Sequence, residues 1–337
     1  MEEHMRKTVK LLLVLLVLSL LVTATVSAAD EKLKVALILP GQADDMSFNQ
    51  AMYDAMMQVA DEYADKIEVT VVEKVYEVAD IEPALMDFAS QDYDIIFGHG
   101  FQFQEPLIAV AEMFPETAFC LGTGYLTLPN TAVYDVELDT GGYLMGVLAA
   151  LMSETGKIGV VGGADVSEIF RGHEGYKYGA KSINPDIVIE EVYTGDWNDS
   201  AGAKEAAISM YDDGVDIIWH SGDGIGLGVL EAAKEKGKFA LGNVADQHTL
   251  APDNVLSGVV YQWAPIIKNI IDDVFSGAFF KTDPLFYWIN IPNNGLTYAP
   301  FYELSDKVPA DVQAQVEQTY NDLKDGKIEL PDFEAAK

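Results

Sequence analysis

The chain has 337 residues, of which 49% are hydrophobic and 10% aromatic, so it is long enough for two domains with substantial cores and too apolar to be disordered throughout. Its formal net charge of −33 at pH 7 argues against a nucleic acid or an anionic membrane surface as a partner, because phosphates would be repelled. The acidic residues are spread along the chain, which is typical of the solvated surface of an exported protein.

Residues 1–28 have the pattern of a secretory signal peptide. Basic residues precede an apolar run at 11–22, and small residues at 26–28 would suit cleavage before Ala29. The run is shorter than the ~20 apolar residues that a membrane span needs. No cysteine stands at the cleavage site. The sequence therefore predicts an exported protein, in a periplasm or at the outer face of the cytoplasmic membrane, that is not lipid-anchored through such a cysteine.

The first strand of the fold is expected at residues 35–39. Within it, Val35 and Leu37 alternate with Ala36 and Ile38, so both faces of the strand are apolar. This pattern predicts a central parallel strand that helices cover on both sides.

The loop after this strand carries the stretch Asp44-Asp45-Met46-Ser47-Phe48-Asn49. It would lie at the carboxyl end of the strand, where open α/β sheets bind ligands. Its carboxylates, hydroxyl, amide and aromatic ring suit a polar, flat ligand. The alternative is a helix start with Asp45 or Ser47 as the N-cap. We expect both roles, one residue capping the helix and others contacting a ligand.

Strands and helical segments alternate along the rest of the chain. The first unit is expected to have helices at 49–63, 81–88 and 105–114 and further strands at 67–72, 94–97, 118–121 and 131–136. A second unit begins near residue 140, with helices at 142–152, 167–183, 201–211 and 224–236 and strands at 157–161, 187–192, 215–219, 239–241 and 255–260. The chain then continues with a helix at 265–275, a strand at 286–289, a crossing at 291–294 and a helix at 310–323.

This alternation predicts an α/β protein with parallel sheets built from βαβ units. No Pro- or Gly-rich linker separates the two units, so we expect two Rossmann-like lobes joined by a multi-strand hinge. The N-terminal lobe would comprise residues 32–137 plus 263–290, and the C-terminal lobe residues 138–262 plus 291–337.

The chain lacks the common motifs of catalytic sites. Its glycine-rich stretch at 222–228 follows a strand and opens a helix, but the spacing fails G-x-G-x-x-G. As a helix N-terminus it could still hold a polar ligand group. No histidine is spaced for a transition-metal site, the single Cys120 fits a buried strand, and G-x-S-x-G is absent. We therefore expect a binding protein, with neither cofactor nor metal, rather than an enzyme.

Aromatic residues gather at the predicted strand ends and lobe edges: Phe48, Phe101, Phe103, Tyr125, Trp197 and Trp263. Phe103 and Trp263 are better explained as core residues, since aromatic rings dominate cores. Trp197 differs, because it stands between polar Asx residues and a glycine just after a strand. We expect its ring to stack on a flat ligand.

From about residue 34 to residue 290, the sequence resembles the basic membrane protein family of ABC-transporter substrate-binding proteins, the purine-nucleoside-receptor-like group. Four stretches carry the resemblance: Asp45–Asn49 for the D-x-S-F-N loop, 171–186 for the helix ending in N-P-D, 195–207 for the segment with a stacking aromatic, and 242–247 for the G-x-x-x-D-Q turn. Each motif alone is weak, but their order and spacing together are specific.

The resemblance implies the type I periplasmic-binding-protein fold and capture of a purine nucleoside or nucleobase for an ABC permease in the membrane. By position, Asp45 and Asn49 would hydrogen-bond the ligand and Asp246 would hold a polar edge or hydroxyls. Phe48 and Trp197 would pack on the purine ring. The remaining candidate ligand contacts are Ser47, Phe101, Asp223 and Tyr261. We expect a monomer.

Tyr261 departs from the family pattern, because nucleoside-binding members tend to carry there a lysine that meets the sugar. Together with Trp197 in place of a phenylalanine, this resembles members that bind free bases, with Tyr261 filling the space of the sugar. Two alternatives remain: a receptor for another small polar solute such as a sugar, and a secreted enzyme that acts on nucleosides.

Overall fold

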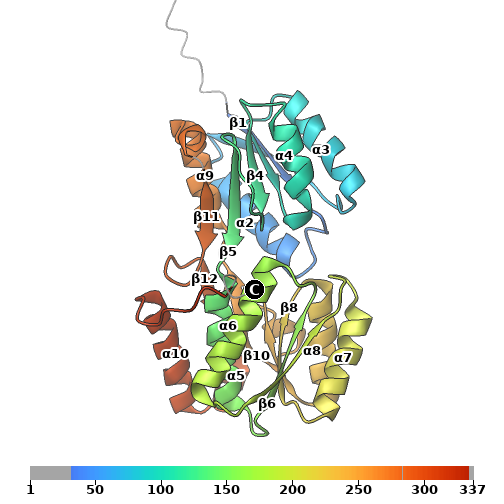
Figure 1. The fold of residues 1–337 in the computed structure, drawn as a ribbon, viewed down its shortest axis with the longest axis vertical. Coiled ribbons are helices and arrows are strands. Elements are labelled where there is room, and N and C mark those ends of the chain that lie inside the picture. The colour runs from blue at the N-terminus through green and yellow to red at the C-terminus, as the bar shows by residue number, and fades with distance from the viewer. Residues whose placement is uncertain (1–31, 283, 334–337) are drawn as a thin grey trace, which may run out of the picture.

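The structure, a computed structural model, describes residues 32–282 and 284–333. The signal peptide predicted at 1–28 lies outside these residues. Within the described part of the chain, no helix is long and apolar enough to cross a membrane. Figure 1 shows two lobes, one above the other, each built around its own twisted sheet.

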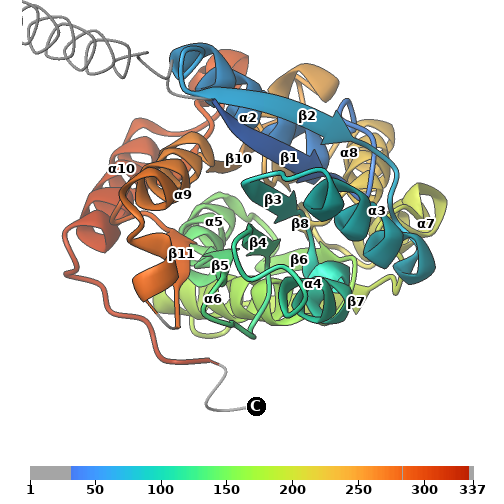
Figure 2. The same cartoon turned by 90° about the horizontal axis from the view of Figure 1, so that it is seen from above.

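The sheet of the N-terminal lobe has six parallel strands. In spatial order they are β11 (Phe286–Ile289), β5 (Thr131–Val136), β4 (Ala118–Gly122), β3 (Ile95–Gly98), β1 (Leu33–Ile38) and β2 (Ile67–Val72). Helices α2 (Phe48–Glu62) and α9 (Ala264–Ser276) pack on one face, and α3 (Val78–Ser90) and α4 (Gln104–Ala111) on the other, as Figure 2 shows from above.

The central strand β1 shows why helices cover both faces of this sheet. Val35 and Leu37 pack in the core that includes α2 and α9, whereas Ala36 and Ile38 pack in the core beneath α3 and α4. All four side chains are fully buried. The apolar alternation predicted from the sequence is therefore confirmed.

The sheet of the C-terminal lobe also has six strands. In spatial order they are β12 (Leu296–Tyr298), β10 (Val255–Tyr261), β9 (Phe239–Gly242), β8 (Ile217–Ser221), β6 (Lys157–Gly162) and β7 (Val188–Tyr193). Helices α5 (Leu138–Met152), α6 (Ser167–Ile183) and α10 (Ala310–Lys324) lie on one side, and α7 (Ser200–Asp212) and α8 (Gly224–Lys236) on the other.

Strand β12 differs from the sequence prediction, which had a plain crossing in this region. It pairs antiparallel with β10, Val259 lying opposite Tyr298, whereas the other pairs in this sheet are parallel. A strand of three residues is too short to show a period of two, so its pairing depends on the neighbouring β10.

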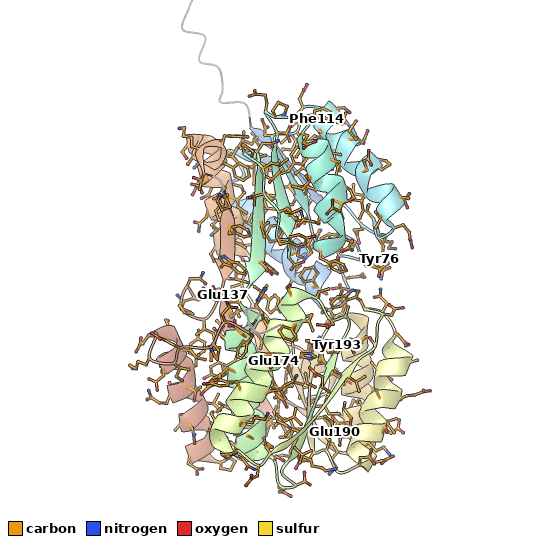
Figure 3. All side chains as sticks on the ribbon, viewed as in Figure 1. Tyr76, Phe114, Glu137, Glu174, Glu190 and Tyr193 are labelled. Carbon is orange, nitrogen blue, oxygen red and sulfur yellow. The ribbon has the colours of Figure 1, made fainter. Side chains whose placement is uncertain are left out.

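The chain passes between the two sheets after β5, after β10 and after β11. Two of these crossings are tied together, since the Asn290 side-chain amide donates a 2.9 Å hydrogen bond to the Glu137 carboxylate. In Figure 3, Glu137 lies at the boundary between the lobes, and Tyr76 lies at the same boundary on the opposite side of the molecule. We propose that these crossings form the hinge.

Candidate functional site

A cleft lies between the lobes, where the carboxyl ends of both sheets face each other. It holds about 700 Å³ of space between the atoms, part of it open to solvent. The segments that follow β1, β2, β3 and β4 line it from one lobe, and those that follow β6, β7, β8 and β9 line it from the other. This is the position at which open α/β sheets bind ligands.

The loop before α2 is organised by Asp45. Its carboxylate accepts hydrogen bonds from the backbone N–H groups of Ser47 at 2.8 Å, Asn49 at 3.1 Å and Gln50 at 3.0 Å. It also accepts one from the Asn49 side-chain amide at 2.7 Å. The Asp45 side chain therefore caps the N-terminus of α2, although Ser47 occupies the N-cap position. Asp45 does not line the cleft, so the structure offers no support for its predicted ligand contact.

Phe48 and Asn49, the first residues of α2, do line the cleft. The Phe48 ring stacks on His99, with ring centroids 3.8 Å apart. His99 is held by the Tyr134 hydroxyl at 2.9 Å and the Phe48 carbonyl at 3.1 Å. Burial lowers the pKa of His99 to about 3, so this ring stays neutral. The carbonyl accepts, so Nε2 carries the proton, and Phe48 rests on a rigid, uncharged support.

Trp197 lines the cleft from the other lobe. Its indole lies over Gly163, where an added Cβ would clash with the ring. The Trp197 backbone carbonyl accepts a 3.1 Å hydrogen bond from the Ile225 N–H, which ties the loop to α8. Phe101, 40% exposed, approaches with ring centroids 6.3 Å apart. Phe103 and Trp263, in contrast, are buried in the core as expected.

Asp223 reaches from the C-terminal lobe to the N-terminal lobe. It lines the cleft, and its carboxylate accepts hydrogen bonds from the Ser47 hydroxyl at 3.4 Å and from the Phe48 backbone N–H. Burial and the charge of Asp45 raise the pKa of Asp223, these two hydrogen bonds oppose the shift, and the net result is a pKa of about 7. Ser47 itself is buried and contacts Asp223 rather than the cleft.

Tyr261 and Asp246 lie elsewhere than the sequence suggested. Tyr261 is 5% exposed, does not line the cleft and donates a 2.9 Å hydrogen bond to Glu168. Asp246 is exposed and accepts a 2.6 Å hydrogen bond from the Tyr302 hydroxyl, outside the cleft. Neither residue is among those that line the cleft, so the structure gives no support to the idea that Tyr261 fills the space of a sugar and leaves Asp246 to the ligand.

Polar cleft residues that the sequence did not single out include Gln102, Glu168, Asn198 and Asn243. Glu168 reads in the sequence as an ordinary acid in the first turn of a helix. No local signal distinguishes it, because its partner Tyr261 is 93 positions away. Among the described residues that line the cleft, none is basic.

Two residues that line the cleft have strained backbone conformations. Val244 and Thr123 line the cleft with positive φ angles of 68° and 54°. A β-branched residue with positive φ is an outlier, and such strain clusters at ligand sites. This supports the assignment of the cleft as the functional site.

A Ser–His–Glu chain of hydrogen bonds lies beside the cleft. His173 bonds to the Ser221 hydroxyl at 2.6 Å and to the Glu191 carboxylate at 2.8 Å. Burial alone would raise the pKa of Glu191, but hydrogen bonds from His173 and Lys177 lower it to about 2. Ser221 is fully buried and does not line the cleft.

Metal binding has no support in the described residues, since no group of three or more His, Cys, Asp or Glu side chains there is placed to hold an ion. Cys120 is buried in β4 as predicted.

Comparisons with known proteins agree with this architecture. A family model described as ABC transporter substrate-binding protein, PnrA-like, matches residues 32–329. A purine-binding protein of Brucella abortus is 31% identical over 300 residues, which cover 89% of this chain and 83% of that protein. A protein of Haloferax volcanii, named as an ABC transporter glucose-binding protein, is 28% identical over 88% of this chain and 74% of its own length.

The solved structure of an ABC transporter solute-binding protein from Conexibacter woesei superposes with a TM-score of 0.73 at 28% identity, covering 89% of this chain and 99% of that chain. The predicted fold, two α/β lobes of the periplasmic-binding-protein type, is thereby confirmed. From the family model, the relatives and the fold together, this chain belongs to the PnrA-like family of ABC transporter substrate-binding proteins.

Proposed function

We propose that the protein is the exported receptor of an ABC importer, that it captures a purine nucleobase or nucleoside between its lobes, and that it delivers this ligand to a membrane permease without chemical change. The single observation that carries the purine assignment is the pair of aromatic rings in the cleft. Phe48 comes from one lobe and Trp197 from the other, and both line the same space. Two such rings suit a flat heterocycle, which gains contact with each lobe as the cleft closes.

The charge of the cleft supports a neutral ligand. Its described lining contains the carboxyl groups of Glu168 and Asp223 and no basic side chain. A nucleotide or an organic acid would bring an anion into a low-dielectric site without a counter-charge, which is costly. The purine-binding relative at 31% identity agrees with a purine rather than a nucleotide.

A sugar receptor is the second candidate, because the Haloferax relative is named as glucose-binding. Aromatic rings and carboxylates also suit sugars, so the ligand must be identified directly. Mass spectrometry of any small molecule released from the purified protein, followed by calorimetric titration with adenine, hypoxanthine and glucose, decides between the two. We expect a purine to bind and glucose not to bind. Binding of glucose alone would overturn the purine assignment.

An enzyme acting on nucleosides is tested by incubating the protein with inosine. We expect inosine to remain intact, because the Ser221 hydroxyl that pairs with His173 is fully buried and does not line the cleft. Release of free hypoxanthine with turnover would contradict the receptor function.

The preference for free bases over nucleosides stays a prediction. Nucleoside receptors of this family tend to carry a lysine that meets the sugar. The described residues that line this cleft include no cation, which favours a ligand without a ribose. Paired calorimetric titrations should show hypoxanthine binding more tightly than inosine. Equal or tighter binding of inosine would show that the protein accommodates the ribose.

A further inference from the structure

Glu168 is a buried carboxyl group at the edge of the cleft. Glu168 lies in the first turn of α6, is 8% exposed and lines the cleft beside Ile169. The Tyr261 hydroxyl donates to its Oε1 atom at 2.9 Å, so the side chain is held in one position.

Asn243 supplies a second polar group in the same cleft. It follows β9 and is 1% exposed. Its side-chain oxygen has no hydrogen-bond partner among residues 32–282 and 284–333. A buried acceptor without a partner is unfavourable, so this oxygen needs an N–H or O–H donor that the surrounding protein does not provide.

Tyr261 brings these two groups together. Its hydroxyl donates to Glu168, and the Asn243 side chain hydrogen-bonds to the same hydroxyl. The two cleft side chains therefore share one partner and stand within two hydrogen bonds of each other.

The surroundings favour the neutral form of Glu168. Burial and the negative charges of Asp135 and Asp223 raise its pKa, the Tyr261 hydrogen bond and the charge of Arg171 oppose the shift, and the net result is a pKa of about 8. Arg171 is already engaged with Asp135 at 2.8 Å and with the Val136 carbonyl at 3.0 Å. In its neutral form, which these surroundings favour near neutral pH, Glu168 is a carboxylic acid with an O–H to donate.

We propose that Glu168 and Asn243 form the specificity subsite of the cleft, in which Glu168 donates to an acceptor atom of the ligand and the Asn243 oxygen accepts from a neighbouring N–H. The class of ligand that fits has an amidine or lactam edge, such as ring N1 and the 6-amino group of adenine. This inference rests on the proposed function and deepens it, because it states which edge of a purine is recognised.

The test compares wild-type protein with Glu168→Gln by calorimetric titration of adenine from pH 6 to pH 9.5. Glutamine keeps the shape and a donor but cannot ionise. Since Glu168 must hold its proton to donate to the ligand and its pKa is raised to about 8, wild-type affinity should fall as pH rises through 8, by up to about tenfold per pH unit. Glu168→Gln should bind adenine within about threefold of wild type at pH 6.5 and stay flat above pH 8. Glu168→Met, without a donor, should bind adenine at least about tenfold more weakly than wild type at pH 6.5 and should show no further fall above pH 8.

Two control variants test whether the pH dependence of adenine binding comes from Glu168. Asp223→Asn removes the other acidic group of the cleft and should keep a pH-dependent fall in affinity, shifted toward lower pH because the charge of Asp223 helps raise the pKa of Glu168. Glu174→Gln on the same helix, where the carboxylate pairs with Lys177 at 2.7 Å away from the cleft, should behave as wild type. Melting curves establish that every variant is folded.

Unsubstituted purine tests Asn243, because it lacks the 6-amino group. It should bind at least tenfold more weakly than adenine to wild type, and Asn243→Leu should abolish that difference. If adenine binds but Glu168→Gln follows the wild-type pH curve, the subsite is overturned and the purine function stands. If another purine binds wild type but adenine does not, the subsite is overturned and the purine function stands. If none of adenine, hypoxanthine and inosine binds wild type at any pH, the proposed function is overturned together with the subsite.

Discussion

Trp197 shows how one side chain is made available to a ligand by its neighbours. The loop around it is stabilised from within, since the Thr194 hydroxyl donates to the Asp196 carbonyl at 2.7 Å and the Asn198 N–H donates to the Asp196 carboxylate at 2.9 Å. Gly195 takes a positive φ of 79°, which favours glycine. These bonds position the loop without using the indole ring, so one face of the ring remains for the cleft.

Trp197→Ala should therefore weaken purine binding while the fold survives. Stacking of a base on an aromatic ring contributes about 1–3 kcal/mol, so affinity should drop roughly 5–150-fold at about 1.4 kcal/mol per decade. Calorimetric titration with adenine measures this change.

Tyr125→Ala is the matched control, because Tyr125 is 71% exposed in another loop at a strand end and does not line the cleft. It should bind as wild type does. Unchanged affinity with a lowered melting temperature in Trp197→Ala would show that Trp197 is structural.

At the scale of elements, helices α5 and α6 pack with their backbones in close contact. A Cβ added at Gly142 or Gly146 of α5 would clash with backbone atoms of α6, and one added at Gly175 or Gly179 of α6 would clash with backbone atoms of α5. Small residues on both facing surfaces let the helices approach more closely than side chains would allow. This pair buries Trp219 of β8 and fixes the start of α6, where Glu168 stands.

Gly146→Ala should destabilise the protein, although alanine favours a helix over glycine by about 1 kcal/mol. The added methyl group would meet the Tyr176 carbonyl and the Ala180 backbone nitrogen, which cannot move without separating the helices. Overpacking of this kind costs about 1–3 kcal/mol or more. Thermal unfolding should therefore show a lower melting temperature.

Lys181→Ala, an exposed position on α6, is the control for this change and should leave the melting temperature unaltered. A Gly146→Ala variant as stable as wild type would mean that the two helices tolerate a wider separation than the structure shows.

For the whole molecule, two of the hydrogen bonds that cross between the lobes at the cleft are long. The Ser47 hydroxyl meets Asp223 at 3.4 Å, and the Gln247 amide donates to the Met46 carbonyl at 3.3 Å. Both distances are long for hydrogen bonds. A ligand that contacts both lobes would add to these contacts and shift an open–closed equilibrium toward the closed form.

We therefore predict that the radius of gyration, measured by small-angle scattering, falls when saturating adenine is added. The variant Trp197→Ala should reach the same compact state only at adenine concentrations raised by the same factor as its loss of affinity. A scattering profile that does not change at saturation would count against hinge closure.

The fold could be predicted from the sequence because its apolar residues recur with the periods of strands and helices. The alternation in β1 predicted coverage by helices on both faces, and the order of strands and helices predicted two parallel sheets, because burial of a strand or helix leaves a local period in the sequence. The pattern around Trp197 also placed this ring in a loop, and Phe48, Asn49, Phe101 and Asp223 were among the residues predicted for the site that do line the cleft.

Only the tertiary structure decided which polar groups face the cleft. The carboxylate of Asp45, itself predicted to contact the ligand, accepts hydrogen bonds from backbone N–H groups of its own loop, and Asp246 bonds to Tyr302 outside the cleft. Glu168, unremarkable in the sequence, acquires its place from Tyr261, 93 positions later. A side chain's partners depend on contacts between distant segments, and hydrogen bonds leave no period along the chain. The sequence alone predicted two lobes with a ligand site between them, and only the packing of distant segments determined which polar side chains line that site.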